Sequence, residues 1–378
     1  MGKARNFCIA LAMAGALFFA GCDDSTDAIV LGNSQSGVIE HIFVPSAGAG
    51  INNVAVKNIN TANGATADIT QASAGTTPVM VRTHPNQNLI YVANQGSDNV
   101  SAFTVGANGL LTAVPGSPFA APLGVTAIAV DPTGRFLYAA GGGGAQIRTF
   151  TIAANGSLTN PVNLALVSNP TQVAPVFTRT ANGLFLNVAG ANGGVASIET
   201  FTVNETNGNL TANSISNVAG GTSVDGLSLH PSGTVLVASV EDAGANSSSL
   251  LPLTVNANGS LTQVNGSAVA LGFDCGGTAL SGQGVVYVGS DSSNNVSAFT
   301  VNGTNGALAA LAGSPFAAGQ LSNFVALDPR GGLLFAVDFA NNSLTNFTVN
   351  ANGALTAGAT TGTQLTSPRL PDFAQFAF

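Results

Sequence analysis

Residues 99–105 read NVSAFTV, and this alternation of apolar and polar residues decides the fold because it recurs along the chain. Five later segments repeat it as QIRTFTI, SIETFTV, SLLPLTV, NVSAFTV and SLTNFTV, which end at Ile152, Val203, Val255, Val301 and Val349. Their aligned phenylalanine or leucine positions are 46 to 52 residues apart. A weaker first copy, NVAVKNI, ends at Ile59 and has Lys57 at the aromatic position. The chain therefore contains seven copies of one structural unit.

Each copy predicts four antiparallel strands. In the third copy, an apolar segment at residues 125–130 leads through an Asp-Pro turn to a second alternating segment, and then to the segment that ends at Ile152. Asn155 and Gly156 follow, and an Asn-Gly pair between alternating strands predicts a tight hairpin, because both of its residues need positive φ. The pair recurs at this place in every copy. Seven four-stranded copies predict an all-β fold, a seven-bladed β-propeller.

The two ends of the chain predict how the ring closes. The first copy begins with residues 39–44, which match the second strand of later copies, so its innermost strand is missing. Residues 372–378 (DFAQFAF) follow a Ser-Pro turn at Ser367 and resemble an innermost strand with no copy after it. We therefore expect the C-terminal strand to join the first blade, which removes an unpaired sheet edge.

Three segments carry a resemblance to a known family: residues 99–119 (NVSAFTVGANGLLTAVPGSPF), 130–140 (VDPTGRFLYAA) and 327–337 (LDPRGGLLFAV). They resemble the lactonase-type seven-bladed β-propellers, the family of bacterial 6-phosphogluconolactonase and fungal carboxy-muconate cyclase. The resemblance covers nearly the whole chain after its leader. It implies the propeller fold and, as an expectation, lactone hydrolysis. The matching motifs are blade turns and core strands, so no catalytic residue of the family is carried over.

The N-terminal segment predicts export. Lys3 and Arg5 precede an apolar stretch at residues 7–20, and small residues precede Cys22, which is the layout of a secretory signal. It resembles a bacterial lipoprotein signal with lipid on Cys22, and an ordinary cleaved signal is the alternative. We expect a leader at residues 1–21, a flexible tether at 22–37 and the propeller at 38–378. The predicted location is outside the cytoplasm, membrane-anchored and facing the periplasm or the cell surface.

Charge and single reactive residues restrict the chemistry. Seventeen acidic residues stand against nine basic ones, two of them in the leader, which excludes nucleic acid as a partner. His84 and His230 precede proline in the position that Asp131 holds in another copy, which predicts acceptors that cap turns. We also expect a structural role for His41. Cys275 is expected to be a small buried residue, with a thiol nucleophile as the alternative.

Acidic residues are the remaining signal for a site. In a propeller, the links between blades and the loops joining second to third strands share one face, and many acidic residues fall there. The candidates for catalysis are Glu241, Asp242 and Asp274. The candidates for a ligand or a cation are Asp225, Asp291 and Asp338. Carboxylate oxygens suit calcium, but the sequence contains no motif for a resident cofactor or metal.

Two functions stay open at this point. The shortage of titratable residues favours a monomeric binding or scaffold module for a protein, a glycan or a small polar ligand. The family resemblance favours a lactone hydrolase that acts at the mouth of the channel. The sequence leaves open whether the chain is an enzyme.

Overall fold

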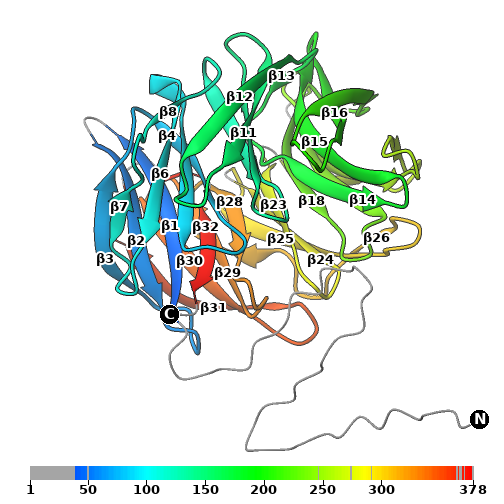
Figure 1. Cartoon of the computed structure of the whole chain (residues 1–378). Coiled ribbons are helices and arrows are strands. Elements are labelled where there is room, and N and C mark those ends of the chain that lie inside the picture. The colour runs from blue at the N-terminus through cyan, green and yellow to red at the C-terminus, as the bar shows by residue number, and fades with distance from the viewer. Residues whose placement is uncertain are drawn as a thin grey trace, which may run out of the picture.

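The computed structural model describes residues 39–48, 51–245, 247–272, 275–290 and 292–362, together with 365, 368, 369 and 371–376. Within these residues, the regular structure consists of β-strands and one short 3-10 helix, η1 (Gln95–Ser97). The strands form seven antiparallel blades arranged in a ring (Figure 1). The predicted seven-bladed β-propeller is therefore confirmed. The predicted leader and tether, with Cys22, lie outside the described residues.

Blade 1 is built from both ends of the ring. Strand β1 (Ile39–Gly48) pairs on one side with β2 (Ile51–Ile59), which in turn pairs with β3 (Thr66–Ser73). On its other side, β1 pairs with β32 (Asp372–Phe376), the last strand of the chain. In Figure 1 the two strands have the blue and red colours of opposite ends of the chain. The expected closure of the ring by the C-terminal strand is confirmed.

Blades 2, 3 and 4 are continuous stretches of chain, described here from the channel outward. Blade 2 consists of β4 (Pro78–Thr83), β5 (Leu89–Asn94), β6 (Asn99–Val105), β7 (Leu111–Ala113) and β8 (Phe119–Ala120). Blade 3 consists of β9 (Val125–Val130), β10 (Phe136–Gly141), β11 (Gln146–Ile152) and β12 (Leu158–Ala165). Blade 4 consists of β13 (Asn169–Pro170), β14 (Val176–Thr180), β15 (Gly183–Asn192), β16 (Val195–Val203) and β17 (Leu210–Asn217).

Blades 5, 6 and 7 follow the same plan. Blade 5 consists of β18 (Ser223–Leu229), β19 (Val235–Asp242), β20 (Ser247–Val255), β21 (Leu261–Gln263) and β22 (Val269–Leu271). Blade 6 consists of β23 (Cys275–Leu280), β24 (Val285–Ser290), β25 (Asn295–Val301), β26 (Leu308–Ala310) and β27 (Phe316–Ala317). Blade 7 consists of β28 (Ser322–Leu327), β29 (Leu333–Asp338), β30 (Ser343–Val349) and β31 (Leu355–Gly362). A single residue pair, Ser290 with Ser322, connects the sheets of blades 6 and 7.

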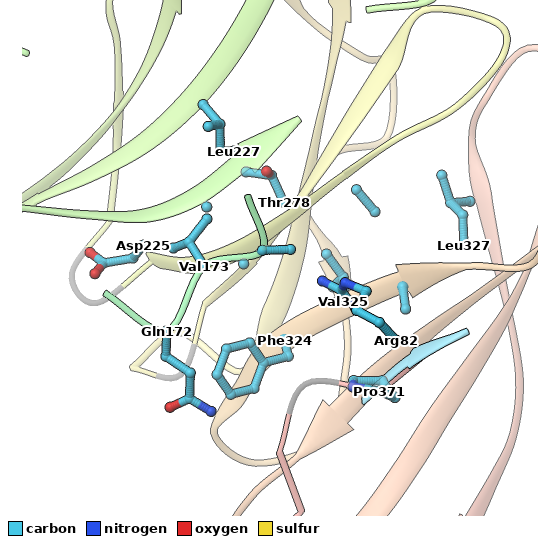
Figure 2. Close-up of a pocket in the computed structure, with 15 residues that line it drawn as sticks. Arg82, Gln172, Val173, Asp225, Leu227, Thr278, Phe324, Val325, Leu327 and Pro371 are labelled. Atoms are coloured by element: carbon cyan, nitrogen blue, oxygen red, sulfur yellow. The ribbon is translucent and has the colours of Figure 1, made fainter. Parts of the chain in front are cut away.

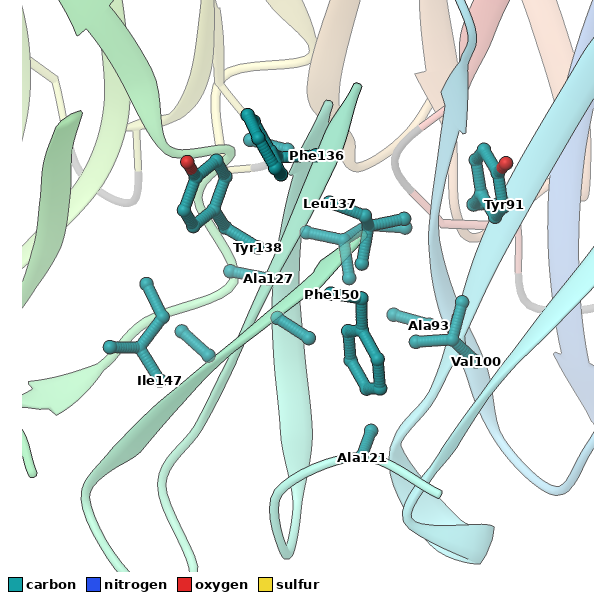
Figure 3. Packing of buried hydrophobic residues seen from close by; sticks show 14 of the residues in the cluster. Tyr91, Ala93, Val100, Ala121, Ala127, Phe136, Leu137, Tyr138, Ile147 and Phe150 are labelled. Atoms are coloured by element: carbon teal, nitrogen blue, oxygen red, sulfur yellow. The ribbon is translucent and has the colours of Figure 1, made fainter. Parts of the chain in front are cut away.

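Apolar side chains pack between neighbouring blades. Phe150, on the third strand of blade 3, is 3% exposed and belongs to a cluster that spans blades 2 to 4. Figure 3 shows it beside Val100 and Ala93 of blade 2. Burying a phenylalanine side chain contributes roughly 1.5–3 kcal/mol, so the repeated aromatic position stabilises successive blade interfaces.

In each Asn-Gly turn only the glycine has positive φ, so the expectation of positive φ at both residues is wrong, although the hairpin itself is present. These turns also hold neighbouring blades together. Gly208 in the turn of blade 4 has φ of +76°, and a Cβ there would lie 2.4 Å from the Phe136 ring of blade 3. Tyr138 of blade 3 donates its hydroxyl to the Gly208 carbonyl at 2.9 Å. The other two tyrosines make the same bond to the next blade, Tyr91 to Gly156 and Tyr287 to Gly353. Glycine at these turns therefore serves both the hairpin geometry and the contact between blades.

Blade 1 departs from this packing at the aromatic position. Lys57 occupies it, is 1% exposed, and forms an ion pair with Asp68 on the neighbouring strand β3. Lys57 lies opposite Ile42, as Phe150 lies opposite Leu137 in blade 3, which confirms the predicted alignment of the weak first copy.

Candidate functional site

The inner strands surround two adjoining cavities in the central channel. The deeper one, of about 220 Å³, is lined by residues of blades 2, 4, 5, 6 and 7 and by Pro371, which precedes β32. The second, of about 210 Å³, lies where the inner strands begin, and we term it the mouth cavity. Its lining residues are Gln172, Val173, Asp225, Glu241, Cys275, Gly276, Asn323 and Phe324. Four of these, Gln172, Val173, Asp225 and Phe324, also line the deeper cavity (Figure 2).

Backbone irregularities aim polar side chains into this mouth. The pairing of β18 with β19 shifts register between Val224 and Gly226, so Asp225 is an extra, bulged residue. The pairing of β28 with β29 shifts at the equivalent place, and Asn323 is the bulged residue there. A β-bulge redirects the side chain of its extra residue, and bulges concentrate next to active sites. Both bulged residues line the mouth cavity.

Two of the predicted acidic residues meet in the mouth cavity. Asp225 comes from the inner strand of blade 5, and Glu241 from the end of its second strand. Ser223 donates its hydroxyl to the Asp225 carboxylate at 3.0 and 3.2 Å, which orients that group. The cavity therefore combines two carboxylates with the side-chain amides of Gln172 and Asn323.

Blade 4 contributes an irregular segment to the channel lining beside these groups. Its inner strand is interrupted between β13 and β14, and the intervening segment carries Gln172. Gln172 donates its Nε2 to the carbonyl of Val79 at 2.9 Å, a bond that reaches from blade 4 past blade 3 to blade 2. This bond fixes the Gln172 side chain at the boundary that the two cavities share.

Arg82 is the basic residue that lines the deeper cavity. It lies on β4 of blade 2 and donates Nη1 to its neighbour's carbonyl, that of Val81, at 2.8 Å. Figure 2 shows Arg82 and Asp225 on opposite sides of the cavity. The channel is therefore electrostatically asymmetric, with Asp225 and Glu241 where the inner strands begin and Arg82 near the end of β4.

The other predicted acidic residues have different surroundings. Asp242 follows Glu241 in the sequence but does not line the mouth cavity. Its Oδ1 accepts the N–H groups of Gly244 and Ala245 at 3.0 and 3.1 Å. Asp338 is fully buried in blade 7, where it accepts hydrogen bonds from the hydroxyls of Ser322, Ser343 and Thr345. Burial raises the pKa of Asp338 despite these donors. Neither residue lines the channel cavities, and their assignment to a site stays a prediction.

Asp274 and Asp291 lie outside the described residues, so their predicted roles also stay predictions. Among the residues that the structure describes, no group of three or more histidine, cysteine, aspartate or glutamate side chains is placed to hold a metal ion. Binding of calcium therefore stays a prediction from the sequence, without a matching cluster among the described residues.

The histidines and the cysteine do not form a nucleophilic pair. None of the three histidines, all of which are described, lines either cavity. His84 Nδ1 accepts the N–H of Asn86 at 3.1 Å, and His230 Nδ1 accepts that of Ser232 at 3.0 Å. In blade 3, Asp131 accepts the N–H of Thr133 at 3.1 Å in the same way, which confirms the predicted turn-capping role. Cys275 is 4% exposed, and it donates its backbone N–H to the Ser248 hydroxyl.

Sequence reasoning missed Gln172, Asn323 and Arg82 as lining residues. An alignment of the inner strands places Asn323 at the same position as Asp225, because both are the bulged residue. That shared position is a signal in the repeat itself. No comparable signal exists for Gln172, which lies in an interruption specific to blade 4.

A third cavity of about 560 Å³ lies on the rim between blades 3 and 4, away from the channel. Its lining contains Arg135 and three apolar residues, Phe136, Ile152 and Val162. The other lining residues are neutral and polar: Thr149, Thr151, Asn160, Thr206, Asn207 and Asn209. Arg135 lies over the Phe136 ring at 5.2 Å and donates Nη2 to the carbonyl of Glu205 and Nε to Thr133. These bonds hold the guanidinium against the wall of the rim cavity.

Comparisons with known proteins agree with this architecture. Residues 111–225 match the family model described as "Lactonase, 7-bladed beta-propeller". No curated protein sequence matches this chain significantly. In the described part of the chain, no helix has the length and apolarity that a membrane span requires.

Solved structures of similar fold include the periplasmic gluconolactonase of Pseudomonas aeruginosa. It is 16% identical, with a TM-score of 0.72, over 88% of this chain and 99% of that one. A Bacteroides fragilis protein provisionally assigned as a 6-phosphogluconolactonase is 18% identical, with a TM-score of 0.71, over 90% of this chain and 98% of that one. A Lactobacillus plantarum protein is 16% identical, with a TM-score of 0.72, over 89% and 99%. The resemblance of this chain to the lactonase-type seven-bladed β-propellers is confirmed, in sequence over residues 111–225 and in fold over most of the chain.

Proposed function

We propose that the chain hydrolyses small neutral lactones in the mouth cavity. The observation that carries the proposal is the meeting of Asp225 and Glu241 with the Asn323 amide in one cavity of about 210 Å³. Pockets for drug-sized ligands begin near roughly 300 Å³, so this volume suits a molecule of monosaccharide size. The similarity in fold to a periplasmic gluconolactonase supports the same reaction class.

The residues of the mouth supply the groups that lactone hydrolysis needs. Glu241 or Asp225 accepts a proton from the water that attacks the carbonyl carbon. In this proposal the side-chain amide of Asn323, which lines the same cavity, donates a hydrogen bond to the oxyanion that develops. The bond between the carbonyl carbon and the ring oxygen then breaks, and the accepted proton passes to that oxygen. The product is the open-chain hydroxy acid.

The charge of the mouth favours a neutral substrate. Two carboxylates line the mouth cavity, and like charges raise the cost of bringing in a phosphorylated sugar. Carboxylates also accept hydrogen bonds from sugar hydroxyls, and the amides of Gln172 and Asn323 add donors and acceptors. We therefore propose an unphosphorylated sugar lactone as the substrate class.

A rate measurement on glucono-δ-lactone tests the proposal. The soluble chain from residue 38 should accelerate hydrolysis above the spontaneous rate in buffer, and Glu241→Gln combined with Asp225→Asn should lower that acceleration by about 10²–10⁴-fold. Asp242→Asn is the matched control, because Asp242 is adjacent in sequence but caps its own loop. A wild-type rate equal to that of buffer, or an unchanged rate in the double variant, would refute the proposal.

We propose that the protein is exported and lipid-anchored through Cys22. The sequence layout of residues 1–22 supports this, and the similar fold of a periplasmic protein supports export. Expression of the full chain should place the protein in the membrane fraction, and Cys22→Ser should release it. Equal distribution of both forms would contradict the anchor.

Binding at the rim is the second candidate function. The rim cavity is larger than either channel cavity, and six of its lining residues are neutral asparagines or threonines. Such groups suit sugar hydroxyls, and the exposed Val162 offers an apolar contact for a sugar ring. Saturation-transfer NMR with neutral tetrasaccharides should detect this contact. Asn209→Ala should abolish it while lactone hydrolysis continues.

A further inference from the structure

The seam between blades 7 and 1 contains a buried group of charges that the proposed reaction does not use. Glu40 on β1 is 1% exposed, and its Oε2 accepts Nη2 of Arg330 at 2.7 Å. The same Nη2 lies 3.1 Å from Oδ2 of Asp328, which is 3% exposed. Two buried carboxylates therefore share one guanidinium. We term these three residues the seam cluster.

The seam cluster occupies the place of a missing connection. In blades 2 to 7, a turn joins the inner strand to the second strand. In blade 1 the inner strand is β32 and the second strand is β1, which are opposite ends of the chain. Between blades 2 and 3, neighbouring turns touch directly, because His84 Nε2 bonds to the Gly134 carbonyl at 2.8 Å. At the seam, the turn of blade 7 meets the Glu40 side chain instead.

The cluster is incompletely satisfied. Oε1 of Glu40 is buried and has no hydrogen-bond partner in the described part of the protein. Oδ1 of Asp328 already accepts the N–H of Leu333 at 2.6 Å, so the Asp328 carboxylate is fixed by its own turn. With both carboxylates ionised the seam cluster has a net charge of −1, and one proton on Glu40 would bring it to zero. The geometry therefore leaves room for one proton in the cluster.

The other charged groups near Glu40 do not neutralise it. On the same face of blade 1, Lys57 is paired with Asp68. On β1, the neighbouring His41 is on the opposite face, where its ring contacts Phe43. On β32, the residue opposite Glu40 is Gln375. Arg330 is thus the cation that faces Glu40 among the described residues.

We propose that the seam cluster is a proton-operated latch that holds the two ends of the ring together when Glu40 is protonated and loosens the seam when it ionises. Loosening would reach the channel, because Leu327 precedes Asp328 and Pro371 precedes β32, and both line the deeper cavity. The latch therefore couples the surrounding pH to the closure of the ring and to the shape of the channel.

The direction of the pKa shift agrees with this geometry. Burial, followed by the charge of Asp328, raises the pKa of Glu40 to about 7, and the nearby Arg330 opposes the rise. A folded-state pKa above the unfolded value means that the folded protein binds the proton more tightly. The stabilisation is fully present below about pH 4.5 and is lost as the pH rises through about 7.

Carbon-13 NMR tests the titration directly, because the chain has four glutamates, Glu40, Glu199, Glu205 and Glu241. With glutamate labelled at its carboxyl carbon, one resonance should titrate near pH 7 and should be missing in Glu40→Gln. A Glu40 carboxyl that titrates near its ordinary value overturns the proposal.

Hydrogen exchange tests the opening. After correction for intrinsic rates, the peptide that contains β32 should exchange about tenfold faster at pH 8.5 than at pH 6 in the wild type. Glu40→Gln should abolish that difference, because glutamine stays neutral. Glu205→Gln is the matched control, since Glu205 forms an exposed pair with Arg179 in blade 4, and it should behave as the wild type. Equal exchange at both pH values in the wild type overturns the latch, even if Glu40→Gln fails to fold.

Discussion

Blades 1 and 3 share one plan but place different residues at equivalent positions. Where blade 3 has Phe136, Tyr138 and Phe150, blade 1 has His41, Phe43 and Lys57. All of these residues are buried. Blade 3 is one continuous stretch of chain, whereas blade 1 is assembled from both ends. The comparison teaches that the blade without covalent continuity has polar residues at core positions that are aromatic in a continuous blade.

Buried charges are a weak source of stability, because desolvation offsets their attraction. We therefore interpret the buried Lys57 and Glu40 as groups that select the correct pairing at the seam, while apolar packing supplies the stability of the other blades. The following changes separate these two contributions, in order of decreasing effect.

Removal of residues 372–378 should have the largest effect. It takes away β32 and leaves the backbone of β1 unpaired along one edge, which exposes a template for aggregation. We expect a strong loss of soluble monomer, measured by size-exclusion chromatography. Removal of residues 377 and 378 alone is the control, and a stable monomer without β32 would show that the seam needs no C-terminal strand.

Substitutions at the repeated aromatic position separate the contribution of apolar packing from that of the Lys57–Asp68 ion pair. Phe150→Ala should lower the free energy of unfolding by about 3–5 kcal/mol, since it leaves a cavity between blades. Lys57→Met combined with Asp68→Asn should leave that free energy unchanged or raise it by about 1–4 kcal/mol, because Lys57 is the buried member of the pair and methionine needs no desolvation of a charge there. Denaturant unfolding measures both. A loss in the double variant as large as that of Phe150→Ala would contradict this interpretation of blade 1.

The tyrosine bonds between blades should have a smaller effect. Tyr138→Phe removes the hydroxyl that bonds to Gly208, and we expect a loss of about 0.5–1.5 kcal/mol in the free energy of unfolding. Tyr287→Phe should cost a similar amount, because Tyr287 makes the equivalent bond to Gly353. Phe43 already lacks this hydroxyl in blade 1. A loss above about 3 kcal/mol would mean that the tyrosine ring itself is displaced.

Exchange of His84 for the aspartate found in other blades should have the smallest effect. Burial lowers the pKa of His84, so its contribution to stability is full above about pH 6.5 and is lost as the pH falls toward the folded-state value. His84→Asp should change the melting temperature little at pH 7.5. It should also reduce the fall in melting temperature that the wild type shows between pH 6.5 and 5. A decline of unchanged size would assign the acid sensitivity to other groups.

The repeat made the fold predictable in detail. Each Asn-Gly pair identified a hairpin, although only its glycine has the expected positive φ. Residues 372–378 predicted an inner strand, which is observed as β32. The same regularity placed Glu241 on the face where it now lines a cavity with Asp225. Local sequence is sufficient here because strand alternation and turn geometry are local properties.

The composition of the site was less predictable, because it depends on departures from the repeat. Asp225 and Asn323 reach the mouth through bulges, and Gln172 reaches it through an interruption in one inner strand. The sequence also could not separate Asp338 from the residues of the channel. Only the three-dimensional arrangement shows that Ser322, Ser343 and Thr345 surround its carboxylate.

The position of β1 determines how the propeller would respond to mechanical load. A pulling force transmitted through the segment before Ile39 enters the ring at β1, which is paired on both sides, with β2 and with β32. Force along such a strand shears many backbone hydrogen bonds at once instead of peeling them off one by one. A protein held to a surface by its N-terminal segment would therefore be pulled at a point where the ring resists extension in shear.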